Sequence, residues 1–184
     1  MLAGAFAHTL GTEDLHTPLS EDVRIVPWYL DRAGYHTGLI RKSHIGEAAL
    51  EQFHFFRQSN DSSQLVDFRD FLNAAGNKPF FMWYAFIDPH RGYGKDIIEQ
   101  PHTPDMAEVP PYLADTEDTR RDLASYYDEI TRLDRCIGEA IGELRARKLL
   151  DKTLVVFLTD NGKPFTRAKG TLYDEGTRTP LIFH

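Results

Sequence analysis

The sequence contains a single cysteine, Cys136, among its 184 residues. One thiol cannot form an internal disulfide framework, so nothing in the cysteine content fixes the compartment. No apolar stretch approaches the ~18 residues that a membrane-spanning helix needs. Basic residues are the minority charge, with 21 Lys and Arg against 28 Asp and Glu. This balance excludes the broad basic field that is typical of nucleic-acid-binding proteins.

Hydrophobic residues make up 41% of the chain, which is enough to bury one sizeable core. Neither internal repeats nor low-complexity tracts are present. Strand-like and helix-like segments alternate along the chain, and this order predicts a three-layer α/β/α fold with a mostly parallel sheet. The sequence does not indicate the oligomeric state.

Three short apolar segments predict strands at residues 36–40, 79–87 and 153–158. The last is rich in β-branched residues, as expected for a strand buried on both faces. Residues 180–183 predict the start of another strand, and residues 7–18 predict a loop.

Helices are predicted at Trp28–Ala33 after Pro27, at Gln64–Ala75 after a cap at residues 61–63, and at Thr119–Lys148. Apolar residues recur at three- and four-residue steps in the long helix, which therefore packs on the sheet and carries no chemistry. Its acidic residues should form a solvated or internally salt-bridged face, and Cys136 should be a buried structural thiol. These acidic residues are Asp128, Glu129 and Asp134.

Charged and imidazole side chains follow each predicted strand at its carboxyl end. Lys42 and His44 follow the first strand, and they point the same way if that strand continues. Asp88, His90 and Arg91 follow the second, whereas Asp160 and Asn161 follow the third. Ligands bind at this edge of open α/β sheets, so the pattern predicts a site for a tetrahedral oxyanion beside a divalent metal.

The oxygen atoms of Asp160 and Asn161 suit Ca²⁺ or Mg²⁺ better than a soft metal. Taken alone, Asp160-Asn161-Gly162 is also an ordinary turn sequence. The metal hypothesis therefore depends on the groups at the other strand ends. Lys supplies a point charge for an oxyanion, and His supplies a donor that also moves a proton.

Four segments, in this order, resemble motifs of the sulfatase family within the alkaline-phosphatase-like superfamily. They are Lys42-Ser43-His44, Asp88-Pro89-His90, Thr159-Asp160-Asn161-Gly162 and residues 169–178, which begin at Lys169. The wording of residues 86–91 and 160–165 is most similar to the heparan N-sulfatase (sulfamidase) branch.

The resemblance implies an alkaline-phosphatase-like fold and hydrolysis of a sulfate ester or sulfamate on a small molecule or glycan. It gives Lys42, His44, His90 and Lys169 the role of holding sulfate oxygens or assisting the leaving group. It assigns Ca²⁺, or Mg²⁺, to Asp160 and Asn161. His16, Asp88 and Arg91 are further candidates for the substrate pocket. Family members are exported to the periplasm or medium, or are lysosomal.

The family nucleophile is a formylglycine made from the Cys or Ser of a Cys/Ser-x-Pro/Ala-x-Arg motif, and this motif does not occur in the sequence. Cys136 is followed by Ile-Gly-Glu-Ala and does not match it. The resemblance places the nucleophile upstream of Met1 and makes residues 1–184 the central part of one catalytic domain, incomplete at both ends. We therefore expect the chain alone to be inactive.

Two alternatives remain open, namely a metal-dependent phosphoesterase of the same superfamily and a noncatalytic remnant. The Lys42-x-His44 pattern with Lys169 favours a sulfatase over a phosphoesterase. Arg41 replaces the glycine that the family has before the lysine, and arginine would be strained there if the backbone needs a positive φ. This departure favours the remnant.

Overall fold

The computed structural model describes residues 1–14 and 16–184, which form two compact units, Met1–Ile87 and Asp88–His184. Both units combine helices with strands, so the predicted α/β class is confirmed. No helix among these residues is both long enough and apolar enough to cross a lipid bilayer. The assignment of residues 1–184 to one catalytic domain stays a prediction.

The first unit is built on a parallel sheet of three strands in the order β2-β1-β3. They are β1 (His36–Arg41), β2 (Phe55–Arg57) and β3 (Phe80–Ala85). Strand β1 pairs with β3 from His36 opposite Phe80 to Arg41 opposite Ala85. The carboxyl ends of two strands therefore meet at one edge, as the sequence predicts. Strand β2 was not predicted, because three residues show no periodicity.

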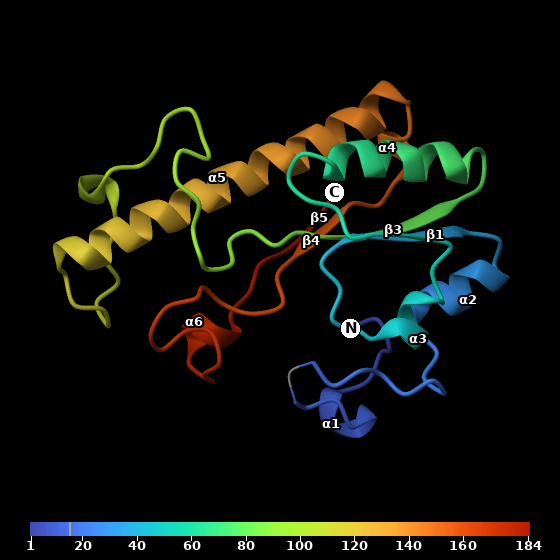
Figure 1. Cartoon of the computed structure of the whole chain (residues 1–184), viewed down its shortest axis with the longest axis horizontal. Coiled ribbons are helices and arrows are strands. Elements are labelled where there is room, and N and C mark those ends of the chain that lie inside the picture. Colours follow the sequence, from blue (N-terminus) through green and yellow to red (C-terminus); the bar gives the residue numbers. More distant parts are fainter. Residues whose placement is uncertain (15) are drawn as a thin grey trace. The chain divides into compact units, whose positions relative to one another are not determined.

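Helices cover both faces of this sheet (Figure 1). On one face lies α4 (Gln64–Ala75), where a Cβ on Gly38 would come within 2.5 Å of the Phe71 ring. Only glycine allows that approach. Leu39 points to the opposite face, because side chains alternate along a strand. It packs there in a cluster with Ile25, just before α2 (Val26–Arg32), and with Ala49 of α3 (Glu47–Leu50). The layering within this unit is α/β/α.

The local structure differs from the prediction at two places. The N-cap position of α4 is Ser63, within the predicted residues 61–63, but its side chain makes no capping hydrogen bond. Asn60 Oδ1 instead accepts from the backbone N–H groups of Ser62 and Ser63 just before the helix, at 3.0 Å each. Residues 7–10, predicted as loop, form the short helix α1 (Ala7–Leu10).

The second unit is dominated by the helix α5 (Glu117–Ala146), which begins where Thr116 Oγ1 accepts a hydrogen bond from the backbone N–H of Thr119, at 3.2 Å. Its Cys136 is buried, as predicted. A strand, β4 (Val156–Leu158), pairs antiparallel with β5 (Leu181–Phe183). The shorter elements are η1 (Pro104–Met106), η2 (Leu150–Lys152) and α6 (Asp174–Thr177).

One expectation about burial in this unit was wrong, and another holds only in part. Leu154 and Val156 are exposed, so the segment around β4 is not buried on both faces. Asp128 and Glu129 of α5 are buried and not solvated, because both carboxylates accept hydrogen bonds from the loop after β3. Asp134 is exposed. The predicted internal salt bridge does occur, between Glu129 and Arg132.

Candidate functional site

In the first unit, β1 ends at Arg41, whose φ of 77° is left-handed. The strand therefore does not continue to Lys42 and His44, and strand alternation does not set their directions. The Lys42 N–H donates to the carbonyl of Ala85 at 3.1 Å, which fixes the backbone of Lys42 to the end of β3. The positive φ that would strain an arginine is present at this position.

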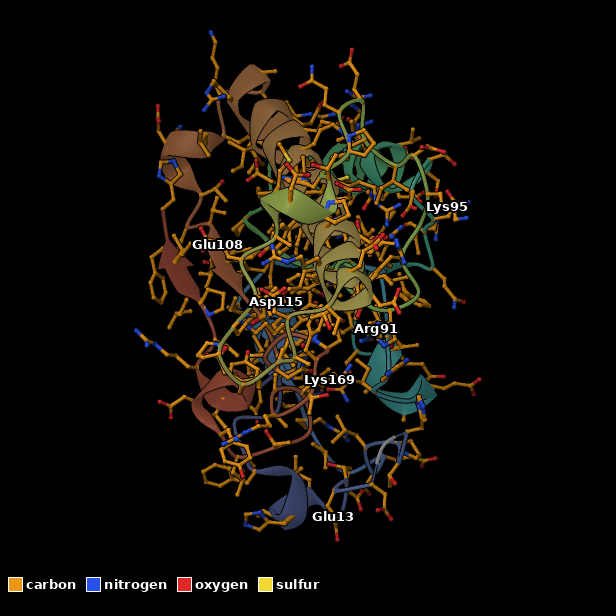
Figure 2. The ribbon with its side chains drawn as sticks, turned by 90° about the vertical axis from the view of Figure 1, so that its left-hand side faces the viewer. Glu13, Arg91, Lys95, Glu108, Asp115 and Lys169 are labelled. Carbon is orange, nitrogen blue, oxygen red and sulfur yellow. The ribbon has the colours of Figure 1, made fainter. Side chains whose placement is uncertain are left out.

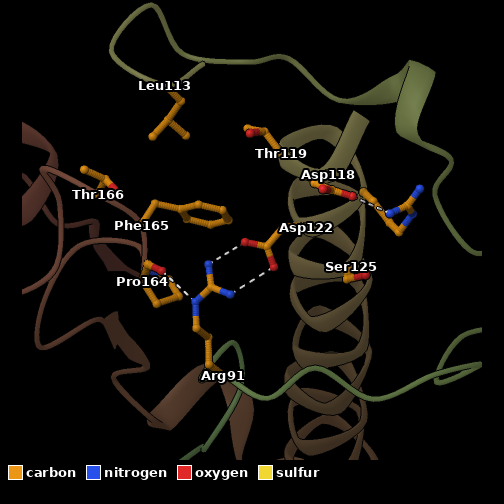
Figure 3. Close-up of a pocket in the computed structure, with 10 residues that line it drawn as sticks. Arg91, Leu113, Asp118, Thr119, Asp122, Ser125, Pro164, Phe165 and Thr166 are labelled. Atoms are coloured by element: carbon orange, nitrogen blue, oxygen red, sulfur yellow. Dashed lines mark hydrogen bonds and ion pairs between the residues drawn. The ribbon is translucent and has the colours of Figure 1, made fainter. Parts of the chain in front are cut away.

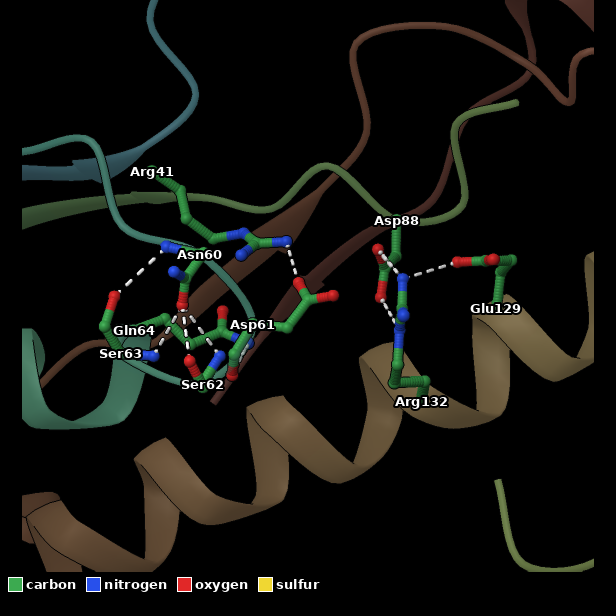
Figure 4. Close-up of polar contacts among 9 residues, drawn as sticks. All are labelled: Arg41, Asn60, Asp61, Ser62, Ser63, Gln64, Asp88, Glu129 and Arg132. Atoms are coloured by element: carbon green, nitrogen blue, oxygen red, sulfur yellow. Dashed lines mark hydrogen bonds and ion pairs between the residues drawn. The ribbon is translucent and has the colours of Figure 1, made fainter. Parts of the chain in front are cut away.

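The side chain of Arg41 is 3% exposed and turns inward to an ion pair with Asp61 (Figure 4). Its Nε and Nη1 atoms are buried without a hydrogen-bond partner among the described residues. The ion pair and the surrounding packing stabilise a backbone that costs an L-residue roughly 1 to 2 kcal/mol. Arg41 therefore adopts a left-handed backbone while its long side chain is buried.

His16 lies against His44, with ring centroids 4.7 Å apart in an edge-to-face arrangement. Both side chains are exposed, and Lys42 is half-buried. Three of the predicted site residues therefore gather near the carboxyl end of β1. His16 was predicted only by resemblance, and the structure places its ring against that of His44.

In the second unit, the segment after β3 presents His90 between two engaged neighbours. Asp88 is 6% exposed and binds Arg132, so its carboxylate is already occupied by an ion pair. Arg91 forms two hydrogen bonds with Asp122, of 2.9 and 2.5 Å, and Nε donates to the carbonyl of Pro164 at 2.9 Å (Figure 3). His90 itself is exposed, with Nδ1 against the Arg91 carbonyl.

The segment after β4 carries the predicted metal pair. Gly162 is required there, because a Cβ would come within 1.7 Å of the carbonyl oxygen of Glu175. The loop then folds back on itself, and the Lys169 N–H donates to the carbonyl of Lys163 at 3.0 Å. The side chain of Lys169 is exposed (Figure 2). The backbone of Lys169 is thereby held close to the metal pair.

Asp160 and Asn161 fit a hard cation by type but supply only part of a site. The Asp160 carboxylate is exposed and makes no ion pair with a described residue. Asn161 Nδ2 donates to the Gly162 carbonyl at 2.8 Å, which leaves Oδ1 available. Calcium takes six to eight oxygen ligands. Among the described residues, no group of three or more His, Cys, Asp or Glu side chains is placed to hold a metal.

A pocket of about 810 Å³ lies beside Arg91 (Figure 3). Arg91 packs against two aromatic rings, with its guanidinium carbon 5.0 Å from the Phe165 centroid and 5.2 Å from that of Tyr93. The hydrogen bond to Asp122 raises the pKa of Arg91. Burial raises the pKa of Tyr93 to about 12, so the phenol stays neutral beside the guanidinium. The pocket is lined by residues 91, 113, 118, 119, 121, 122, 125 and 164–166.

Sequence reasoning missed the residues of α5 that hold the segment after β3. Asp122, Glu129 and Arg132 each bond to that segment. Steps of seven and three residues put them on one side of the helix, a signal that the sequence does contain. The long helix was predicted to carry no chemistry, and it does carry the contacts that fix a candidate site segment.

Comparisons with known proteins agree with the motifs. The sulfatase family model matches residues 54–184. Human N-sulphoglucosamine sulphohydrolase is 32% identical over 99% of this chain and 44% of its own length, so the chain spans less than half of that relative.

Among solved structures, a protein in complex with its substrate D-glucosamine-2-N,6-O-disulfate has a TM-score of 0.74 at 18% identity, over the whole chain and 59% of that protein. A phosphonate monoester hydrolase from Silicibacter pomeroyi gives 0.73 at 18% identity, over the whole chain and 56% of that protein. At such identities the structures support the alkaline-phosphatase-like fold alone. The family follows from the matched model: this chain belongs to the sulfatase family.

Proposed function

We propose that the protein containing this chain hydrolyses a sulfate ester or sulfamate carried by a sugar. The observation that carries the proposal is the sulfatase family match over residues 54–184. The 32% identity to a human N-sulphoglucosamine sulphohydrolase supports a sulfated amino sugar as the substrate class. The proposal covers both a sulfate ester and a sulfamate, because the family match does not distinguish these two bonds.

Lys42, His44, His90 and Lys169 would bind the sulfate oxygens and assist the leaving group. Lys169 and His90 are exposed, so they are free to meet a ligand, and Lys42 is anchored through its backbone at the end of β3. Charge-assisted hydrogen bonds from these groups strengthen as negative charge shifts during the reaction. His90 or His44 would also hand a proton to the departing oxygen or nitrogen.

Asp160 and Asn161 would hold Ca²⁺, or Mg²⁺, together with ligands from elsewhere in the protein. When bound, the ion would supply positive charge beside the sulfate oxygens. We place the nucleophile, a formylglycine by family resemblance, outside these 184 residues. We also propose export or a lysosomal location, on family grounds alone.

A phosphoester or phosphonate hydrolase is the second candidate, because a phosphonate monoester hydrolase has a similar fold. Sulfate and phosphate monoesters are both tetrahedral oxyanions, so the fold does not separate them. The Lys42-x-His44 pattern favours the sulfatase. The noncatalytic remnant is the third, and Arg41 at a positive φ is the feature in its favour.

The test is a substrate panel on the complete gene product. A sulfate ester, a glucosamine N-sulfate and a phosphate or phosphonate ester are compared by kcat/KM, with and without a chelator. Preference for either sulfated substrate supports the proposal. Preference for the phosphorus substrate supports the second candidate, and the absence of turnover with all of them supports the remnant.

A further inference from the structure

Three charged side chains of the second unit form a buried cluster that includes none of the sulfate-binding candidates. Arg132 donates from Nε to Asp88 at 2.7 Å, and from Nη2 both to Asp88 at 2.6 Å and to Glu129 at 2.7 Å (Figure 4). The side chains of Asp88, Glu129 and Arg132 are 6%, 2% and 16% exposed. Two carboxylates thus share one guanidinium away from water.

The cluster holds the segment after β3 on both sides of His90. Asp88 precedes His90 by two residues and is bound to Arg132. Gly94 follows it, and the Gly94 N–H donates to Glu129 Oε1 at 2.8 Å. Glu129 and Arg132 lie one turn apart on α5, so a single turn of a long helix fixes both ends of the short segment that carries His90.

Stability alone does not account for this arrangement. The desolvation of buried ions offsets much of their attraction, and apolar residues of the same volume often replace them without loss. Removing one partner is costly, however, because the others are left uncompensated. A buried hydrogen-bonded network favours one conformation, which is a property that a catalytic segment requires.

We propose that Arg132 is a positioning residue that acts through Asp88 to set the direction of His90 toward the sulfate group. This inference rests on the proposed function, in which His90 touches the sulfate or its leaving group. Glu129 assists by holding Arg132 and Gly94 in place. Neither Arg132 nor Glu129 contacts the substrate in this scheme.

The same helix offers a matched control pair. Arg147 Nε donates to Glu143 at 2.7 Å, and the two side chains are 28% and 14% exposed. Glu143 lies in α5 about three helical turns beyond Arg132, and Arg147 is the residue that caps the carboxyl end of the helix. Glu143→Gln therefore makes the same chemical change as Glu129→Gln, at a carboxylate several turns away from the one that accepts from Gly94.

The test compares Arg132→Lys, Glu129→Gln, Glu143→Gln and His90→Ala in the complete protein. Lysine keeps the charge but cannot form the two-pronged contact, so the variant should fold while the segment shifts. We expect Arg132→Lys to lower kcat by roughly 10- to 100-fold and to change KM by less than about threefold, because a misplaced group acts mainly in the transition state. Glu129→Gln should have a smaller effect of the same kind.

Hydrogen exchange is the second readout, and it should be faster over residues 89–103 in Arg132→Lys than in Glu143→Gln. Unchanged kcat in Arg132→Lys, with His90→Ala impaired, would overturn the inference and leave the proposed function standing. Equal losses of kcat in Glu143→Gln and Glu129→Gln would show that the cluster contributes only to general stability. This result would also overturn the inference. If His90→Ala retains full activity, the role of His90 fails, and the inference fails with it.

Discussion

At the residue scale, Arg41 shows how one position departs from a family pattern without disrupting the strand before it. The sequence predicts backbone strain at Arg41 only if this position needs a positive φ, and its φ is 77°. What the sequence could not reveal is the compensation. The guanidinium is buried against Asp61, and no local pattern pairs residues twenty positions apart.

Arg41→Gly and Arg41→Ala separate the backbone effect from the ion pair. Both variants lose the contact with Asp61, but only alanine keeps the strain of an L-residue at positive φ. We expect Arg41→Gly to be about 1 kcal/mol more stable than Arg41→Ala. Urea unfolding of the complete protein measures the difference. Equal stabilities would mean that the backbone relaxes out of the left-handed region.

Lys169 belongs to the same scale, because its predicted role depends on one ammonium group. Lys169→Ala should lower kcat/KM on a sulfated substrate by about a hundredfold, as expected when one preorganised oxyanion donor is removed. Metal content should not change, since a protonated lysine is not a ligand. Exposed Lys152 supplies the control, and Lys152→Ala should be kinetically normal. Comparable losses in both variants would contradict the assignment.

Asp160 should behave differently from Lys169. Asp160→Ala removes an oxygen ligand, so both bound Ca²⁺ and activity should fall, and excess Ca²⁺ should partly restore activity. Elemental analysis beside kinetics distinguishes the two variants. Cys136→Ser should retain nearly full activity, because the thiol is buried in α5 and burial raises its pKa.

At the scale of elements, periodicity predicted well wherever an element is long. The boundaries of α4 match the prediction, and α5 lies within two residues of it. The short elements β2 and α3 were missed because they complete no period, whereas the three-residue strands β4 and β5 were predicted from their apolar residues. The acidic face of α5 was misjudged for another reason. Burial of Glu129 depends on the N–H of Gly94, a contact between distant parts of the chain.

Tyr93, in the loop after β3, should make the folded protein less stable at alkaline pH. Burial raises the pKa of Tyr93 to about 12, above the value near 10 of an unfolded chain. The native state therefore holds this proton more tightly, so its stabilising effect is complete below pH 10 and is lost as the pH rises toward 12. The unfolding midpoint should decline less steeply over this range in Tyr93→Phe. Parallel declines would show that Tyr93 is accessible to solvent.

At the scale of the whole molecule, the order of the motifs along the sequence predicted more about the fold and the family than the number of residues between them. Strand ends carrying Lys42, His90 and Asp160 were recognisable because each follows an apolar run. A local pattern could not predict whether these residues share one centre, because that depends on long-range packing and on the further oxygen ligands that a Ca²⁺ site needs. The chain spans 44% of the length of its human relative.

The difference that we expect in turnover and Ca²⁺ binding between this chain and the complete protein is directly testable. The 184 residues contain the side chains that we propose to bind sulfate but no Cys/Ser-x-Pro/Ala-x-Arg motif, and positioned donors without a nucleophile would hold sulfate without attacking it. Expressed alone, the chain should give no turnover of a sulfate ester and should bind Ca²⁺ weakly by calorimetry. The complete protein should hydrolyse the ester and should bind Ca²⁺ more tightly. Turnover by the chain alone that His90→Ala abolishes would place the nucleophile within these residues and contradict the proposed mechanism.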